Sequence, residues 1–299
     1  MPDAEFESRL LWILGSPRSG STWLLRLLAE HEAVVAIDEP LIGDHLGIFL
    51  CDRPGVAAAD FKRENFSTYR LLRGASDYFF ADEFKPVWQP LLGDLIRRRF
   101  LAHVMARRAS GPVSKTLVAI KEPNGSQAAD LIMGALPHAR LLFLLRDGRD
   151  VVDSELAAIE KGSWMSDAFA PFRGIEPAQR LDIAVECAYK WLWRTEVVQA
   201  AFHAHPGPKL LLRYEGLLRD TQGELRRLFD WLRLELTDAA LATVVERRSF
   251  ERIPAELRGS RRFFRAARPG SWRENLSEDE QRAVEEVIGP KLRELGYES

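Results

Sequence analysis

Short apolar runs of the length of a β-strand recur along the chain, and each is followed by Gly, Pro, Arg or an acidic residue. Continuous apolar runs of this length are typical of parallel strands that are buried on both faces of a sheet. The predicted strands are Leu10–Leu14, Val34–Ile37, Leu117–Ile120, Leu141–Leu145 and Leu210–Leu212.

Between and after these runs, apolar residues recur at helical spacing. The predicted helices are Thr22–Glu30, Glu83–Arg108, Ser126–Leu136, Asp150–Glu160, Pro177–His203, Thr221–Leu234 and Ser277–Leu295. The last has the clearest start, because Ser277 and Glu280 have the Ser-x-x-Glu spacing of a capping box. Strands that alternate with helices predict an α/β fold, with a central parallel sheet of about five strands and helices on both faces.

Two segments, about 51–82 and 161–176, carry scattered aromatic residues with weak periodicity. We interpret them as insertions on the substrate side of the fold and not as separate domains. The sequence contains no internal repeat, low-complexity tract or convincing linker. Residues 1–299 are therefore predicted to form a single domain.

Composition and charge narrow the class of protein. The chain has 46% hydrophobic residues, enough for a substantial core, and 42 basic against 44 acidic side chains, for a net charge of -2. This balance gives no reason to expect nucleic acid or an anionic membrane as partner. The two cysteines, Cys51 and Cys187, fit a reducing compartment. The acidic first residues and the absence of an apolar stretch of roughly 18 residues predict a cytoplasmic protein without a signal peptide or membrane insertion.

The stretch between the first predicted strand and helix has the form of an anion site. It reads Gly15-Ser16-Pro17-Arg18-Ser19-Gly20-Ser21-Thr22-Trp23. The Gly-x-x-x-x-Gly spacing lets backbone N–H groups curl around an oxyanion at the positive end of a helix. A nucleotide triphosphatase would place Lys after the second Gly, where this chain has Ser21; its cation is Arg18, inside the loop. The alternative is a plain turn that joins strand to helix.

This stretch resembles the 5′-phosphosulfate loop of sulfotransferases that use 3′-phosphoadenosine 5′-phosphosulfate (PAPS), in which Lys or Arg precedes Ser-Gly. In motif style the chain is closest to bacterial and carbohydrate sulfotransferases. The resemblance implies that Arg18 contacts the bridging or sulfuryl oxygens, and that Trp23 lies against the adenine. Simple packing into the core is the alternative for Trp23. The implied loop residues are Pro17, Arg18, Ser19, Gly20, Ser21, Thr22 and Trp23.

A second strand-to-helix turn follows Leu145 and reads Arg146-Asp147-Gly148-Arg149. Arg146 at the strand end and Ser154, about two helical turns onward, could converge on one phosphate. The pair is similar to the 3′-phosphate motif of the same family, which begins with Arg and ends with Ser. By this resemblance Arg146 and Ser154 would read the phosphate that distinguishes PAPS from ATP. A charged turn that caps a helix is the alternative.

Two further matches lie toward the carboxyl end. The segment Phe263–Arg273 resembles the family's Arg-Lys-Gly…Gly-x-Trp-Lys element, which implies that Arg265 and Gly270 bind the nucleotide. Ala266-Ala267 replaces the Lys and Gly, so the loop's backbone contacts to the 3′-phosphate are expected to differ; a solvated basic segment is the alternative. Tyr214 matches a family Tyr that lies near the adenine, or it is a core aromatic.

The acceptor hydroxyl needs a base, and two glutamates follow predicted strands. Glu39 comes after the second strand and Glu122 after the third, where the strand ends of a doubly wound sheet face the binding crevice. Glu39 is favoured, because Glu39-Pro40-Leu41 resembles a Glu-Pro-Leu of carbohydrate sulfotransferases. Lys121 aligns near a catalytic Lys of cytosolic members and is expected to aid the leaving group. His45 is the second choice of base.

The resemblance implies a PAPS-dependent sulfotransferase that transfers a sulfuryl group to a hydroxyl or similar nucleophile of a small-molecule, sugar or lipid acceptor. No metal is expected, because the histidines offer no ligand spacing and the sulfuryl group carries less charge than a phosphoryl group. The alternatives are a nucleotide kinase or other phosphotransferase with the same loop, and a non-catalytic module that binds a phosphonucleotide.

Overall fold

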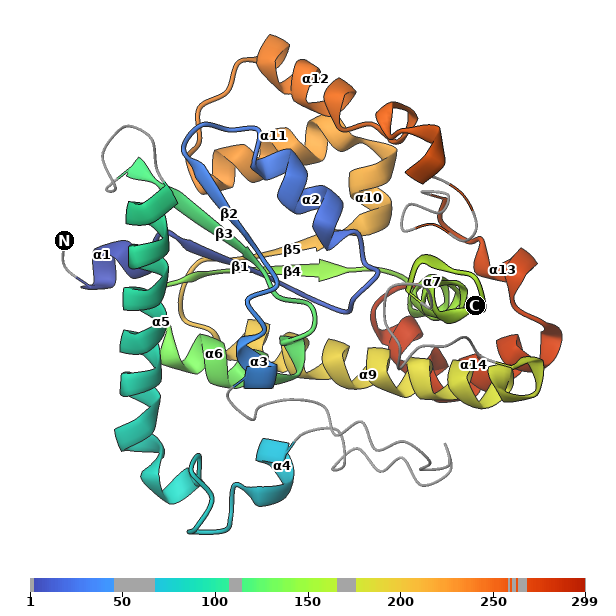
Figure 1. Cartoon of the computed structure of the whole chain (residues 1–299), viewed down its shortest axis with the longest axis horizontal. Coiled ribbons are helices and arrows are strands. Elements are labelled where there is room, and N and C mark those ends of the chain that lie inside the picture. Colours follow the sequence, from blue (N-terminus) through green and yellow to red (C-terminus); the bar gives the residue numbers. More distant parts are fainter. Residues whose placement is uncertain are drawn as a thin grey trace.

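The computed structural model describes residues 3–45, 68–107, 115–165, 176–257 and 268–298, together with 259 and 262. Within these ranges the chain forms one five-stranded sheet with helices on both faces (Figure 1). Most of the two predicted insertions, 51–82 and 161–176, lies outside the described residues.

All strand pairs are parallel, and the strand order is β2-β3-β1-β4-β5. The strands are β1 Leu10–Leu14, β2 Val34–Asp38, β3 Leu117–Lys121, β4 Arg140–Leu145 and β5 Lys209–Arg213. Each predicted strand is confirmed to within one residue at either end. The sequence did not predict the strand order, which puts β1 in the centre and brings the turns after β1 and β4 next to each other.

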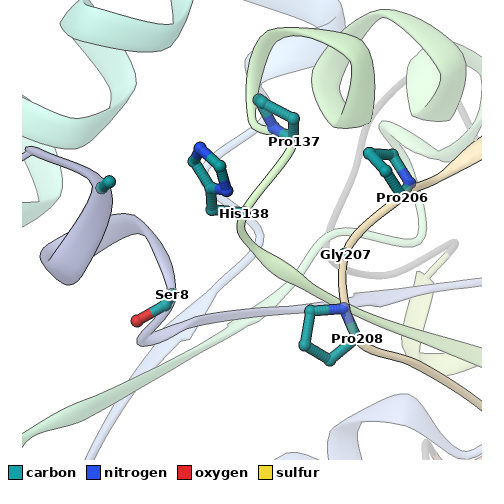
Figure 2. Close-up of a pocket in the computed structure, with 7 residues that line it drawn as sticks. Ser8, Pro137, His138, Pro206, Gly207 and Pro208 are labelled. Atoms are coloured by element: carbon teal, nitrogen blue, oxygen red, sulfur yellow. The ribbon is translucent and has the colours of Figure 1, made fainter.

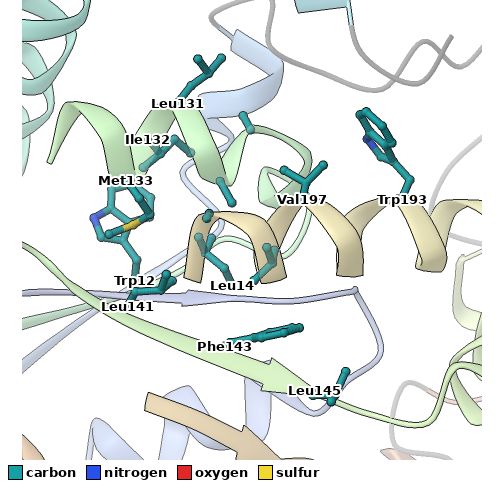
Figure 3. Close-up of a cluster of buried hydrophobic side chains, with 14 of the residues drawn as sticks. Trp12, Leu14, Leu131, Ile132, Met133, Leu141, Phe143, Leu145, Trp193 and Val197 are labelled. Atoms are coloured by element: carbon teal, nitrogen blue, oxygen red, sulfur yellow. The ribbon is translucent and has the colours of Figure 1, made fainter. Parts of the chain in front are cut away.

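One face of the sheet is covered by α6 (Ala129–Ala135), α9 (Arg180–Ala204) and neighbouring helices (Figure 3). Trp12, Leu14 and Phe143 project from the strands into this cluster and are almost completely buried. Helices α5 (Lys85–Arg107), α7 (Gly148–Ile159) and α14 (Glu278–Glu294) extend the same core. Alternate residues of each strand supply this face because successive side chains point to opposite sides.

The other face is covered by α2 (Ser21–Leu28) and α11 (Thr221–Leu232) (Figure 1). Leu11, Ile13 and Leu142 belong there to one buried hydrophobic cluster with Phe229 of α11. Because both faces of every central strand are buried, the strands read as continuous apolar runs. The predicted α/β fold is confirmed.

The long predicted helices are present, with shifted ends. Ser126–Leu136 is a short 3₁₀ turn followed by α6, and the capping box at Ser277 is formed at the start of α14. The helices without a sequence prediction are short or peripheral: α1 Asp3–Glu7, α3 Ile42–His45, α4 Thr68–Leu72, α10 Tyr214–Arg219, α12 Asp238–Arg247 and α13 Trp272–Asn275. Among the described residues, none of the helices is long and apolar enough to span a bilayer.

A hollow of about 440 Å³ opens at the amino-terminal edge of the sheet (Figure 2). It is lined by Ser8, Pro137, His138 and Pro206–Pro208, which come directly before β1, β4 and β5. The turns after β1, β2, β3 and β4, which hold most of the predicted site residues, lie at the opposite, carboxyl edge of the sheet, so this hollow is separate from them.

Candidate nucleotide and acceptor site

The loop between β1 and α2 is tightly fixed. Gly15 N donates to Ser126 Oγ at 2.9 Å, and that hydroxyl in turn donates to Gly15 O at 2.8 Å. Arg18 (φ 63°) and Gly20 (φ 86°) take left-handed backbone conformations. Gly20 also has no room for a side chain, because a Cβ there would lie 2.5 Å from Cδ2 of Tyr214. These contacts give the loop one curled conformation, as the Gly-x-x-x-x-Gly spacing predicts.

The two predicted anion turns meet. Arg146 Nη1 donates to Arg18 O at 2.7 Å, and Arg18 Nε donates to Ser154 Oγ at 3.0 Å. Arg146 and Ser154 are themselves buried. The adjacent strands β1 and β4 thus bring Arg18 into one cationic site with Arg146 and Ser154, which lie more than a hundred positions further along the sequence.

The turn after β4 is held from several sides. Asp147 caps α7 by accepting from Arg149 N at 2.9 Å, and its carboxylate also binds the Arg149 guanidinium. Asp150, in the first turn of α7, accepts from Gly270 N at 2.8 Å. Burial raises the pKa of Asp150, while the charge of Arg146 and the Gly270 N–H act in the opposite direction.

Tyr214 lies at the centre of this arrangement. The Arg146 guanidinium stands 4.5 Å above its ring, and the Trp23 ring meets it edge-on at 6.3 Å. Burial raises the pKa of Tyr214, so its hydroxyl remains protonated at neutral pH. Trp23 is anchored by its indole N–H, which donates to Arg248 O at 2.8 Å. Tyr214 and Trp23 therefore form an aromatic wall beside Arg146.

A second cluster joins the ends of β2 and β3. Lys121 Nζ lies 2.6 Å from Asp38 Oδ1 and 2.7 Å from Glu39 Oε1, and it donates to Thr22 Oγ1 at 2.9 Å. Asn124 Nδ2 donates to the other Glu39 oxygen at 2.8 Å. Lys121 thereby connects the end of the loop between β1 and α2, through Thr22, to the carboxylate of Glu39.

The two glutamates predicted as candidate bases differ in their surroundings. The Glu39 side chain is 33% exposed, and its backbone is left-handed (φ 47°). Glu122 is fully buried, and its Oε2 accepts from Leu41 N at 3.0 Å. Glu122 thus supports the turn that carries Glu39, and only Glu39 presents its carboxylate to solvent.

The sequence model of the sulfotransferase family matches residues 11–238. The chain belongs to the sulfotransferase family. The prediction of the family is therefore confirmed. No curated protein sequence matches the chain.

Solved structures of sulfotransferases share the fold of this family member. Mouse sulfotransferase SULT7A1, complexed with PAP, has 12% identity and a TM-score of 0.55, with 95% of this chain and 83% of that chain covered. Sulfotransferase STF9 from Mycobacterium avium has 15% identity and a TM-score of 0.52, with 97% and 77% covered. Retinol dehydratase, in complex with androsterone and the inactive cofactor PAP, has 16% identity and a TM-score of 0.50, with 98% and 83% covered.

Some predicted site residues of this sulfotransferase cannot be placed. Arg265 and the side chain of His45 lie outside the described residues. Gly270 is described, with φ 79°, and its N–H is engaged by Asp150. Its contact with a nucleotide stays a prediction, as do the roles of the other predicted residues.

Sequence reasoning missed several residues that shape the site. Asn124 and Ser126 follow the Glu122-Pro123 turn, and no motif marks them as partners of Glu39 and Gly15. Glu215 follows the predicted Tyr214 without a predicted role of its own, yet its Oε1 accepts from Asp147 N at 2.9 Å. Their position within a few residues of a strand end was the one available signal.

Proposed function

We propose that this sulfotransferase uses PAPS as its sulfuryl donor and transfers the sulfuryl group to a hydroxyl or similar nucleophile of a small-molecule, sugar or lipid acceptor. The observation that carries the proposal is the meeting of Arg18, Arg146 and Ser154 in one site. A nucleotide with a phosphosulfate at one end and a 3′-phosphate at the other needs cations near both, and these two turns supply them from neighbouring strands.

Two buried polar atoms of the site that lack a hydrogen-bond partner in the described part of the chain support the binding of a nucleotide there. Ser19 Oγ and Arg146 Nε are buried and have no hydrogen-bond partner among the described residues. Leaving such groups unpaired costs about 1–3 kcal/mol each, so an anion that accepts from them would recover this cost. Both atoms belong to the two turns that the sequence predicts to bind phosphate.

We assign the loop Pro17–Thr22 to the 5′-phosphosulfate, and Arg146 with Ser154 to the 3′-phosphate. Tyr214 and Trp23 supply the aromatic surface on which adenine would stack. Bound PAPS supplies the activated sulfuryl group. Arg18 and the backbone N–H groups of the loop stabilise the negative charge that builds up during transfer, so this proposal includes no metal.

We assign the role of general base to Glu39, because it alone of the two candidate glutamates is exposed. Lys121 and Asn124 each hold one of its oxygens and so fix its direction, while the oxygens retain lone pairs for the acceptor proton. In the transfer, the acceptor hydroxyl would give its proton to Glu39 as the acceptor oxygen bonds to sulfur. The bond between sulfur and the bridging phosphate oxygen would break in the same step, with adenosine 3′,5′-bisphosphate as the leaving group. The contacts of Lys121 with both carboxylates support a positioning role for it.

Thermal stabilisation by nucleotides tests the proposal. Adenosine 3′,5′-bisphosphate (PAP) should raise the melting temperature of the chain more than ATP with Mg²⁺ does, because Arg146 and Ser154 would read the 3′-phosphate. A preference for ATP with Mg²⁺ would point to the phosphotransferase alternative and overturn the assignment. Turnover of PAPS with a panel of hydroxylated acceptors then separates an enzyme from a binding module.

A further inference from the structure

The chain turn that ends α14 sets the position of Tyr297, next to the end of β5. Gly296 is left-handed (φ 77°), Tyr297 N donates to Leu292 O at 2.9 Å, and Gly296 N donates to Arg293 O at 3.0 Å. This pair of bonds is the Schellman motif that ends many helices. Arg213 at the end of β5 also donates to Leu295 O, and its guanidinium lies 4.9 Å above the Tyr297 ring. The Tyr297 side chain is therefore held against the carboxyl edge of the sheet.

From there a chain of hydrogen bonds leads to Arg146. The Tyr297 hydroxyl donates to Glu215 Oε2 at 3.2 Å, and Glu215 Oε1 accepts from Asp147 N at 2.9 Å. Asp147 directly follows Arg146, and Glu215 directly follows Tyr214, over which the Arg146 guanidinium stands. One carboxylate thus fixes both the backbone and the aromatic support of Arg146.

The protonation states suit this arrangement. Burial raises the pKa of Tyr297, and the nearby Glu215 charge adds to the effect, so the hydroxyl stays a donor. Burial also raises the pKa of Glu215, whereas the N–H of Asp147 and the charge of Arg146 favour its ionised form. A phenol donor on the second oxygen favours the ionised form further.

We propose that Tyr297 is a positioning residue of the nucleotide site, which acts through Glu215 and Asp147 to orient Arg146 toward the 3′-phosphate. This inference rests on the proposed function, because it assumes that Arg146 reads that phosphate. It concerns a residue outside the loops that touch the nucleotide, more than 140 positions along the sequence from Arg146.

The test compares two Tyr→Phe variants by calorimetric titration with PAP and with 5′-AMP, which lacks the 3′-phosphate. Tyr297→Phe should weaken PAP binding by about three- to ten-fold, the range of one hydrogen bond, and leave 5′-AMP binding unchanged. Tyr69→Phe is the matched control, because its hydroxyl also donates to a carboxylate, Asp82 Oδ1 at 2.5 Å, and its helix α4 lies well apart from the carboxyl terminus of the chain (Figure 1). It should leave the binding of both nucleotides unchanged.

A Tyr297→Phe variant that binds both nucleotides like the wild type, or that loses both equally, would overturn the positioning role. If this variant does not fold, Glu215→Gln takes its place and should show the same selective loss of PAP binding; an equal loss of both nucleotides would again overturn the role. Failure of the proposed function looks different, because the unaltered chain would then bind PAP no better than 5′-AMP.

Discussion

At the scale of single residues, turnover should depend on the carboxylate of Glu39. Glu39→Gln keeps the size of the side chain, but it cannot take the acceptor proton. Its amide oxygen can still accept from Lys121, and its amide N–H can donate to Asn124 once the Asn124 amide turns over. We expect kcat to fall by about 100-fold or more, the range for loss of a general base, with PAP affinity unchanged. Initial rates and calorimetric titration check this.

Asp38→Asn is the matched control for that variant. Asp38 is the neighbouring residue and contacts the same Lys121 nitrogen, but its side chain is 58% exposed and has no assigned part in proton transfer. Asp38→Asn removes one negative charge beside Lys121, as Glu39→Gln does, but it leaves the proposed base in place. The kcat of Asp38→Asn should therefore fall far less. Equal losses in the two variants would show that the charge beside Lys121 matters, and not the base.

At the scale of elements, the junction of β1 and α2 depends on Gly20. Gly20→Ala places a methyl group against the Tyr214 ring in a left-handed backbone conformation. Backbone strain and overpacking together should lower the free energy of unfolding by about 2–4 kcal/mol and weaken PAP binding. Denaturant unfolding and calorimetric titration measure both effects.

Gly74→Ala provides the comparison. An added Cβ at Gly74 meets no atom within 4 Å, so this variant should unfold like the parent chain. If Gly20→Ala were as stable as Gly74→Ala, this would contradict the close packing of Gly20 against the Tyr214 ring.

At the scale of the whole molecule, acid stability should depend on His205. The side chain is buried at the end of α9, and its Nε2–H donates to Ala139 O at 2.8 Å. Burial lowers its pKa, so the unfolded chain takes up the proton first as the pH falls below about 6.5. This group therefore reduces stability with falling pH, by at most about 1.4 kcal/mol per pH unit, and has no effect well above that value.

His205→Gln keeps a neutral donor for Ala139 O and should flatten this part of the stability–pH curve, measured by urea unfolding between pH 5 and 8. His203→Gln, at an exposed position two residues earlier, should leave the slope as it is. If the free energy of unfolding depended on pH in the same way for the parent chain and for His205→Gln, His205 would not be a source of acid sensitivity.

Much of the fold and part of the site could be predicted from local sequence. The strand Leu10–Leu14 was found because a strand buried on both faces must be apolar throughout. Helix α10 was missed, since six residues give too short a pattern for helical periodicity to appear. The turns with Arg18 and Arg146 were found because Gly spacing and strand-end cations mark them in the sequence.

By itself the sequence determined the strands, the long helices and the two cationic turns, because apolar periodicity and turn chemistry act between near neighbours. Only the tertiary structure decided that β1 lies between β3 and β4, and so that Arg18 meets Arg146. It also buried Glu122 and exposed Glu39, and it brought Tyr297 to Glu215. Such contacts depend on how distant segments pack around one core, and no local pattern encodes the distance between them.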